Sequence, residues 1–305
     1  MYAKARLTLI LFLLPLTGCV LGAGEALIFP TYQEGETSFP LKVEVPPLFS
    51  GNGNYGLVAS GDTLYHMELR HGRIHGKTPV NGEITAIAAG SGSNSFLTHG
   101  DTLVLLSGFD IAATCQLSGT GLAMTVCGTD PVILLDDGTL QLYSGADLSL
   151  IGSFTPEDPS VTCIQGFPGI VTIGYQNGTM LSLSIPSFSE TASEKANGSL
   201  LFLAGAGEKL IFACDAWNEV AVCLPQDLII QEMFTFSETP VSASSDPEIS
   251  CVYAVCPSSG LQVCLANGEI AWRTDEFGRD IFVVLSDDRE KALVTEGNTV
   301  YLLLR

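Results

Sequence analysis

Gly61-Asp62-Thr63-Leu64 is the first of seven copies of one signature, in which a turn of Gly, Asp, Asn or Ser leads into an apolar strand. The later copies are Gly100-Asp101-Thr102-Leu103, Asp137-Gly138-Thr139-Leu140, Asn177-Gly178-Thr179-Met180, Asn218-Glu219-Val220, Ser259-Gly260-Leu261 and Gly297-Asn298-Thr299-Val300. Their first apolar residues follow one another at intervals of 39, 37, 40, 40, 41 and 39 positions. A period near forty residues is typical of propeller blades. The sequence therefore predicts an all-β, seven-bladed β-propeller of four-stranded antiparallel blades.

Each repeat divides into four strands, named A to D from the central channel outward, and the signature joins B to C. Gly-Asp, Asp-Gly and Asn-Gly supply the backbone conformations that two-residue hairpins require. Inner segments such as 103–106 and 132–135 are apolar without alternation, which indicates that both of their faces are covered. The A strands that would line the channel are predicted at 41–45, 84–88, 122–126, 161–165, 200–204, 241–244 and 281–285.

The seventh repeat reaches strand C at residues 301–305, and no D strand follows it. Residues 26–32 precede the first A strand and belong to no repeat. We expect them to form the missing outermost strand, which would tie the two ends of the chain together. Pro30 is compatible with this position because an edge strand leaves one side of its backbone unpaired. Residues 26–305 are thus predicted to form one propeller domain.

The first residues have the pattern of an export signal. Lys4 and Arg6 precede an apolar run at 7–16, which is too short to span a bilayer, and Leu16-Thr17-Gly18-Cys19 follows. These last four residues resemble the lipobox of bacterial lipoproteins. The resemblance implies a signal peptide at residues 1–18, acyl chains such as palmitate on Cys19, and a short tether at 19–25. An ordinary secretory signal, with Cys19 an incidental thiol, is the alternative.

Location follows from the same resemblance. Val20 stands where an aspartate commonly retains lipoproteins in the inner membrane. We therefore expect a lipid-anchored protein of the cell envelope, on the outer membrane and facing the periplasm if the host has two membranes.

The charge is strongly acidic, with 33 Asp and Glu against 13 Lys and Arg among 305 residues. Removing residues 1–18, which hold two basic and no acidic residues, changes the net charge from −20 to −22. Nucleic-acid binding needs clusters of cations that neutralise phosphates. Nucleic acid is therefore excluded as a partner.

Eight cysteines follow Cys19. Cys214 and Cys223 flank the fifth turn and could form a disulfide if that loop is wide, whereas the others are expected to be buried thiols within strands. No Cys-x2-Cys pair or matching Cys/His set occurs, so no structural zinc is expected. No nucleotide- or cofactor-binding motif is present, and we assign no cofactor, metal or catalytic residue.

Two segments are candidates for binding a partner. The run Arg70-His71-Gly72-Arg73-Ile74-His75-Gly76-Lys77 holds Arg70, His71, Arg73, His75 and Lys77 together on an acidic protein. It would suit an acidic partner, or it is an outer strand whose charges block edge-to-edge pairing.

Trp217 lies in the fifth predicted hairpin turn. Exposed aromatic residues often anchor protein partners, but the ring could equally fold back over its own blade.

Residues 266–272, Ala-Asn-Gly-Glu-Ile-Ala-Trp, and residues 144–152 resemble the C-to-D corner of quinoprotein-like and WD40-like propellers. Together with the lipobox, the chain is similar in plan to the propeller lipoprotein of the outer-membrane β-barrel assembly machine. That lipoprotein has eight blades, whereas seven repeats are counted here. The resemblance implies a propeller fold and an envelope location.

The function expected from the sequence is a protein-binding or scaffolding module in the envelope, with a protein partner and a membrane anchor. A propeller enzyme, such as a lactonase-like hydrolase or a quinone-dependent dehydrogenase, is one alternative. Such an enzyme would gather polar side chains at the channel mouth, whereas the predicted A strands are mainly aliphatic. A purely structural envelope component is the other alternative.

Overall fold

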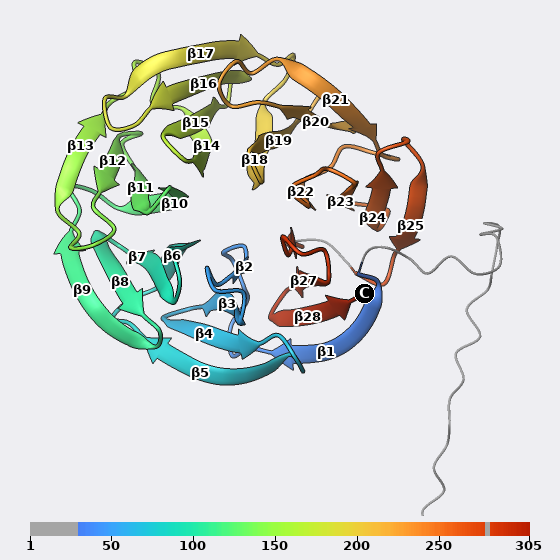
Figure 1. Cartoon of the computed structure of the whole chain (residues 1–305), viewed down its shortest axis with the longest axis horizontal. Coiled ribbons are helices and arrows are strands. Elements are labelled where there is room, and N and C mark those ends of the chain that lie inside the picture. The colour runs from blue at the N-terminus through green and yellow to red at the C-terminus, as the bar shows by residue number, and fades with distance from the viewer. Residues whose placement is uncertain (1–29, 278–280) are drawn as a thin grey trace, which may run out of the picture.

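The computed structural model describes residues 30–277 and 281–305, which form seven four-stranded antiparallel sheets arranged as a ring around a central channel (Figure 1). The predicted seven-bladed propeller is confirmed. Blade 1 contains β2 (Leu48–Phe49), β3 (Tyr55–Ser60), β4 (Thr63–Glu68) and β5 (Arg73–Pro79); blade 2 contains β6 (Ile84–Ala89), β7 (Asn94–His99), β8 (Thr102–Ser107) and β9 (Asp110–Gln116). Blade 3 contains β10 (Gly121–Cys127), β11 (Asp130–Leu135), β12 (Leu140–Tyr143) and β13 (Leu150–Phe154); blade 4 contains β14 (Val161–Phe167), β15 (Ile170–Tyr175), β16 (Thr179–Ser184) and β17 (Ser189–Lys195).

The remaining blades follow the same order. Blade 5 contains β18 (Leu200–Ala206), β19 (Lys209–Cys214), β20 (Glu219–Cys223) and β21 (Ile230–Thr235); blade 6 contains β22 (Ser242–Ser245), β23 (Cys251–Cys256), β24 (Gly260–Leu265) and β25 (Ile270–Thr274). Blade 7 contains β26 (Val283–Leu285), β27 (Lys291–Glu296), β28 (Thr299–Leu304) and, from the other end of the chain, β1 (Tyr32–Ser38).

The antiparallel order gives the ring two distinct faces. Each A strand begins where the preceding D strand ends, so the D-to-A connections share one face with the B–C turns. We call this the D–A face. The A–B and C–D turns share the opposite face, which we call the A–B face. The seven signature turns therefore all lie on the D–A face.

The core lies between neighbouring blades. Between blades 2 and 3, Phe96 and Leu103 pack with Ile133 and Tyr143, and all four side chains are buried. This contact covers the second face of the inner strands, which explains their apolar sequence without alternation. Burying each large apolar side chain contributes about 1.5–3 kcal/mol, so the ring is held mainly by these interfaces.

The N-terminal strand closes the ring as expected, but its predicted position was wrong. β1 comprises Tyr32–Ser38 and pairs with β28, Tyr32 opposite Leu304 and Ser38 opposite Thr299, and the two lie side by side in Figure 1. The prediction placed this strand at 26–32, of which 26–29 lie outside the described residues. The observed strand has the polar sequence Tyr-Gln-Glu-Gly-Glu-Thr-Ser because it is the outermost strand and is largely exposed. The apolar sequence of residues 26–32 therefore did not indicate where this strand lies.

The first A strand was also misplaced. Residues 41–45 form no strand, and blade 1 begins its sheet at β2 instead. The backbone N–H groups of Phe39 and Val43 donate to the carbonyls of Asn298 (2.7 Å) and Gly297 (2.8 Å), so this segment crosses the B–C turn of blade 7. Val43 is buried there because it packs between blades 7 and 1. Its apolar character reflects this contact rather than a place in the channel wall.

The predicted signal peptide (1–18), the lipid-attachment residue Cys19 and the tether (19–25) lie outside the described residues. Within residues 30–277 and 281–305, no helix is long and apolar enough to cross a membrane.

Candidate functional site

The central channel is lined by the innermost strand of every blade, which Figure 1 labels from β2 around to β22, and by β26 of blade 7. It contains two cavities, one of about 530 Å³ toward the D–A face and one of about 630 Å³ toward the A–B face. Because seven blades converge here, the channel is where side chains from distant parts of the sequence meet. The two ends differ in chemistry.

The end on the D–A face is apolar. Leu122 is 51% exposed, Val241 is 42% exposed and Leu201 is 37% exposed, although all three line the channel cavity. Pro46 and Phe282 line the same opening. We call these five residues the apolar mouth. Aliphatic side chains near the start of an A strand reach past the packed wall toward solvent, so this end offers an unpartnered apolar surface.

A second cavity extends the apolar mouth across blades 6 and 7. Its volume is about 440 Å³, and it shares Val241 and Phe282 with the mouth. Val43 and Ile281 form part of its wall, and Lys42 and Glu44 lie at the same cavity. The mouth is therefore one end of a longer apolar groove rather than an isolated opening.

Carboxylates surround the apolar mouth on the same face. They lie in the B–C turns and the D-to-A connections, and they include Asp62, Glu83, Asp101, Asp136, Asp137, Glu157, Asp158, Asp215, Glu238, Asp275 and Glu276. We call this set the acidic frame. In Glu238, hydrogen bonds from the Ser259 hydroxyl and from the backbone of Ser258 and Ser259 lower the pKa of the carboxyl. Hydrogen bonds from the side chain and backbone of Ser160 lower the pKa of Asp158 in the same way. Both shifts favour the charged form of these two carboxyls.

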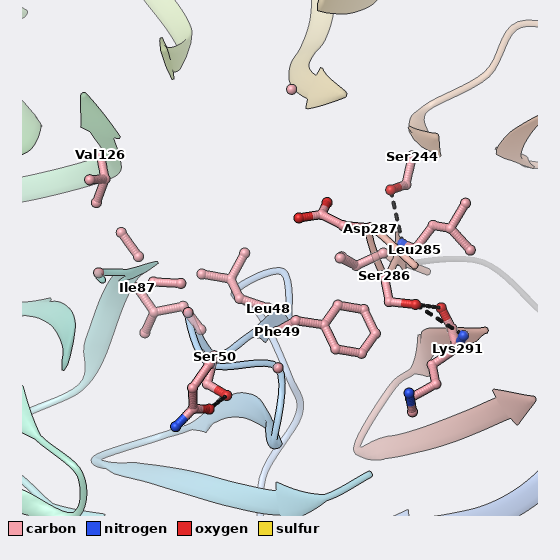
Figure 2. Close-up of a pocket in the computed structure, with 18 of the residues that line it drawn as sticks. Leu48, Phe49, Ser50, Ile87, Val126, Ser244, Leu285, Ser286, Asp287 and Lys291 are labelled. Carbon is pink, nitrogen blue, oxygen red and sulfur yellow. Dashed lines mark hydrogen bonds between the residues drawn. The ribbon is translucent and has the colours of Figure 1, made fainter. Parts of the chain in front are cut away.

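The end on the A–B face is polar, but its polar groups are engaged in local structure (Figure 2). Ser286 Oγ lies 2.6 Å from Asp288 Oδ1 and accepts a hydrogen bond from the Lys291 backbone N–H at 3.0 Å. Ser244 Oγ accepts from the Leu285 N–H at 2.9 Å, which links blades 6 and 7. Partial burial by itself would raise the pKa of Asp288. Hydrogen bonds from Ser286 and the charge of Lys291 outweigh this and keep the pKa of Asp288 below its usual value. These groups stabilise a turn.

Neither end assembles an evident catalytic group. Within the described residues, no three His, Cys, Asp or Glu side chains are placed to hold a metal ion. Burial raises the pKa of the Cys163 thiol, which lines the cavity toward the D–A face, to about 11, so this thiol is protonated and a poor nucleophile at neutral pH.

The candidate disulfide between Cys214 and Cys223 is not formed. Both are buried free thiols, and the strand register places Cys223 opposite Leu210. The four-residue connection between β19 and β20 keeps Phe212 opposite Ala221, so Cys214 and Cys223 do not face each other. All eight cysteines in the described region are free.

Trp217 folds back against its own blade. Its ring is half-buried and lies 5.9 Å from the ring of Phe212, measured between centroids. This arrangement agrees with the alternative in which the Trp217 ring folds back over its own blade. Its role as a partner anchor stays a prediction.

The cationic run lies where an outer strand was expected, on β5 and the turn before it. Arg70, Arg73 and Lys77 are exposed, His71 Nδ1 lies 3.7 Å from Glu34 Oε1, and the ring of His75 lies 5.3 Å from that of Tyr55. The five residues are distributed over this turn and strand. Their role in partner binding stays a prediction.

The residues of the apolar mouth were not singled out from the sequence. Leu122, Leu201 and Val241 all fall inside predicted A strands, which was the available signal. Which residue of each strand emerges from the packed wall depends on the twist of the blades, and the sequence pattern does not encode it.

Comparison with known proteins yields a fold but no family. No family model and no curated protein matches the chain. Among solved structures, the chain is similar to the β-propeller domain of Cps50 (Swd1) from Myceliophteria thermophila, with a TM-score of 0.77 and 12% identity over 90% of this chain and 100% of that one. At this level of identity the likeness supports the propeller fold alone.

Proposed function

We propose that the protein is a lipid-anchored component of the cell envelope whose propeller binds a protein partner at the apolar mouth. The observation that supports partner binding most directly is the exposure of Leu122, Leu201 and Val241 around one end of the channel. Contiguous exposed apolar surface on a soluble domain commonly marks an interaction site. The adjoining groove gives a partner an extended contact.

Charge indicates what kind of partner fits. The acidic frame encircles the apolar mouth, and the chain as a whole carries a net charge of −20. A segment with Lys or Arg around one apolar side chain would place that side chain in the mouth and its cations against the frame. We therefore propose a basic, partly apolar segment of a protein as the occupant.

The position of the N-terminal segment orients the ring relative to the membrane in this proposal. Thr31 N–H donates to the Leu304 carbonyl at 3.0 Å, so the chain enters β1 from the A–B face. Tyr32 follows Cys19 by thirteen positions, which at ~3.5 Å or less per step allows a span of at most about 45 Å. A lipid on Cys19 would thus hold the A–B face toward the bilayer and leave the apolar mouth free for a partner.

The proposal is favoured over a propeller enzyme by the chemistry of the mouth. A hydrolase or dehydrogenase needs His, Arg or acidic side chains converging on a substrate, and the mouth presents Leu, Val, Pro and Phe. At the opposite end, Ser286, Asp288 and Lys291 are held in one turn by their mutual hydrogen bonds.

Replacing Leu201 by Asp is expected to weaken partner binding at least tenfold, because a carboxylate would be buried in an apolar contact beside an acidic frame. The measurement is the yield of adducts formed in intact envelopes by a photocrosslinking residue at position 122. Ile229→Asp is the matched control, since Ile229 is 63% exposed but lies in a C–D turn on the A–B face. Equal losses of adduct in both variants would contradict the assignment of the mouth.

The lipid anchor has its own test. Radiolabelled palmitate is expected to enter the wild-type protein and not the Cys19→Ala variant, because thioether and amide acylation both require that residue. The label is followed in the immunoprecipitated protein on a gel. Incorporation that survives in Cys19→Ala, or that never occurs in the wild type, would remove the anchor while leaving the crosslinking result unaffected.

A further inference from the structure

A small cavity lies between blades 1 and 2, apart from the apolar mouth and on the opposite face. Its volume is about 210 Å³. Tyr55 and His66 of blade 1 and Phe109, from the C–D turn of blade 2, form its aromatic wall. The ring centroids of His66 and Phe109 are 4.6 Å apart, and those of Tyr55 and Phe109 are 5.7 Å apart. Tyr55 is partly exposed and Phe109 is 37% exposed, so the cavity is close to the surface.

His66 is the unusual member of this wall. The residue is 3% exposed, and its Nε2 makes no hydrogen bond to any described residue. Leaving a buried polar atom unsatisfied costs about 1–3 kcal/mol. β-sheet pairing with Leu57 on one side and Gly76 on the other fixes the backbone of His66, so the strand cannot turn the ring outward.

The imidazole is neutral under ordinary conditions. Burial, and secondarily the nearby His75, lower the pKa of His66 to about 4. A neutral imidazole offers one N–H donor and one acceptor nitrogen, and Nε2 is available in either role. No Lys, Arg, Asp or Glu side chain lines the cavity. A ligand that satisfies Nε2 here is therefore uncharged.

The other polar side chains at the cavity differ in whether they already make hydrogen bonds within the protein. Ser50 Oγ donates a hydrogen bond to Asn52 Oδ1 at 2.8 Å, and Asn52 Oδ1 also accepts one from the Asn54 N–H at 3.0 Å. These two side chains are therefore already hydrogen-bonded within their own loop. The side chains of Asn94 and Ser95, on the blade 2 side, make no hydrogen bond within the described part of the chain. The cavity thus combines an aromatic wall with a few neutral hydrogen-bonding groups.

We propose that this cavity is a binding site for a neutral, ring-sized molecule bearing a hydroxyl group, of the phenol class. Its ring would lie against Tyr55 and Phe109 and its hydroxyl would hydrogen-bond to His66 Nε2. Size supports this assignment, because an apolar cavity of about 150 Å³ is large enough to bind benzene. The site is independent of the partner proposed at the apolar mouth and of the lipid anchor.

The test uses purified full-length protein, with phenol and benzene as probes in calorimetric titration and thermal unfolding. Phenol is expected to raise the Tm and to bind at least tenfold more tightly than benzene. His66→Phe retains a flat ring and removes Nε2, so it is expected to lower phenol affinity at least tenfold and to leave benzene affinity unchanged. His99→Phe is the matched control, because His99 is the last residue of β7 and lies at the D–A face, away from the cavity; this variant is expected to bind phenol as the wild type does.

A measurement on the wild type keeps the test decisive if His66→Phe does not fold. Phenol is expected to shift the imidazole ¹⁵N resonance of His66 Nε2 and not that of His99. Equal phenol affinity in wild type and His66→Phe would overturn the proposal. So would the absence of any phenol effect on the wild-type Tm and on the Nε2 resonance, which would indicate that water alone occupies the cavity.

Discussion

Asp246→Ala is expected to lower the free energy of unfolding by about 3 kcal/mol. Asp246 is fully buried in blade 6 and accepts hydrogen bonds from Arg289 Nε (2.9 Å), the Ser250 backbone N–H (2.8 Å) and Ser250 Oγ (2.9 Å). Arg289 belongs to the A–B turn of blade 7, so the pair joins two blades next to the point of ring closure. We choose the lower end of the usual range for breaking a buried ion pair because the Arg289 side chain is 31% exposed.

The effect is measured by urea unfolding, and the control is Glu248→Ala. Glu248 contacts the same guanidinium, but its side chain is 74% exposed. An exposed ion pair contributes about 0–1 kcal/mol, so this variant should remain close to the wild type. If Asp246→Ala and Glu248→Ala unfold at the same urea concentration, the buried pair does not hold the two blades together.

Gly35→Val is expected to lower the free energy of unfolding by about 1–3 kcal/mol and to weaken the packing of β1, the strand that closes the ring. A Cβ atom at Gly35 would lie 2.8 Å from the His71 carbonyl oxygen and 3.1 Å from the Gly72 Cα. Both neighbours are backbone atoms of the turn before β5, so they cannot rotate away. The side chain would force β1 outward from its position beside β28 and blade 1.

Unfolding in urea, together with limited proteolysis near residues 30–38, measures this effect. Gln33→Val is the control because Gln33 lies on the same strand with its side chain exposed. The control should retain the wild-type midpoint and protease resistance. Equal proteolysis of both variants would show that close packing at Gly35 does not hold the strand.

The number and order of the blades could be predicted because they rest on local chemistry. A turn such as Gly61-Asp62 needs residues that accept a positive φ, and Gly61 has a φ of 61°. That requirement acts within a few residues, so it recurs visibly at each repeat. The apolar inner strands follow for a similar reason, since both of their faces are covered in every blade.

The closing strand could not be placed from sequence. β1 has a polar, exposed sequence that resembles a loop, and only its pairing with β28, some 270 residues away, makes it a strand. Residues 41–45 show the opposite error, because their pattern resembles a strand but they form none. Val43 is apolar because it is buried between blades 7 and 1. Long-range pairing decides both cases, and a local pattern carries no information about it.

The sequence by itself determined the repeat, its seven-fold count, the acidic charge and the expectation of an anchored envelope protein. Only the tertiary structure decided that Leu122, Leu201 and Val241 meet around one opening and that His66 Nε2 faces no protein partner. The physical reason is that the ring gathers the innermost strands of separate repeats around one channel. A periodic pattern specifies each blade, whereas the site lies where the blades converge.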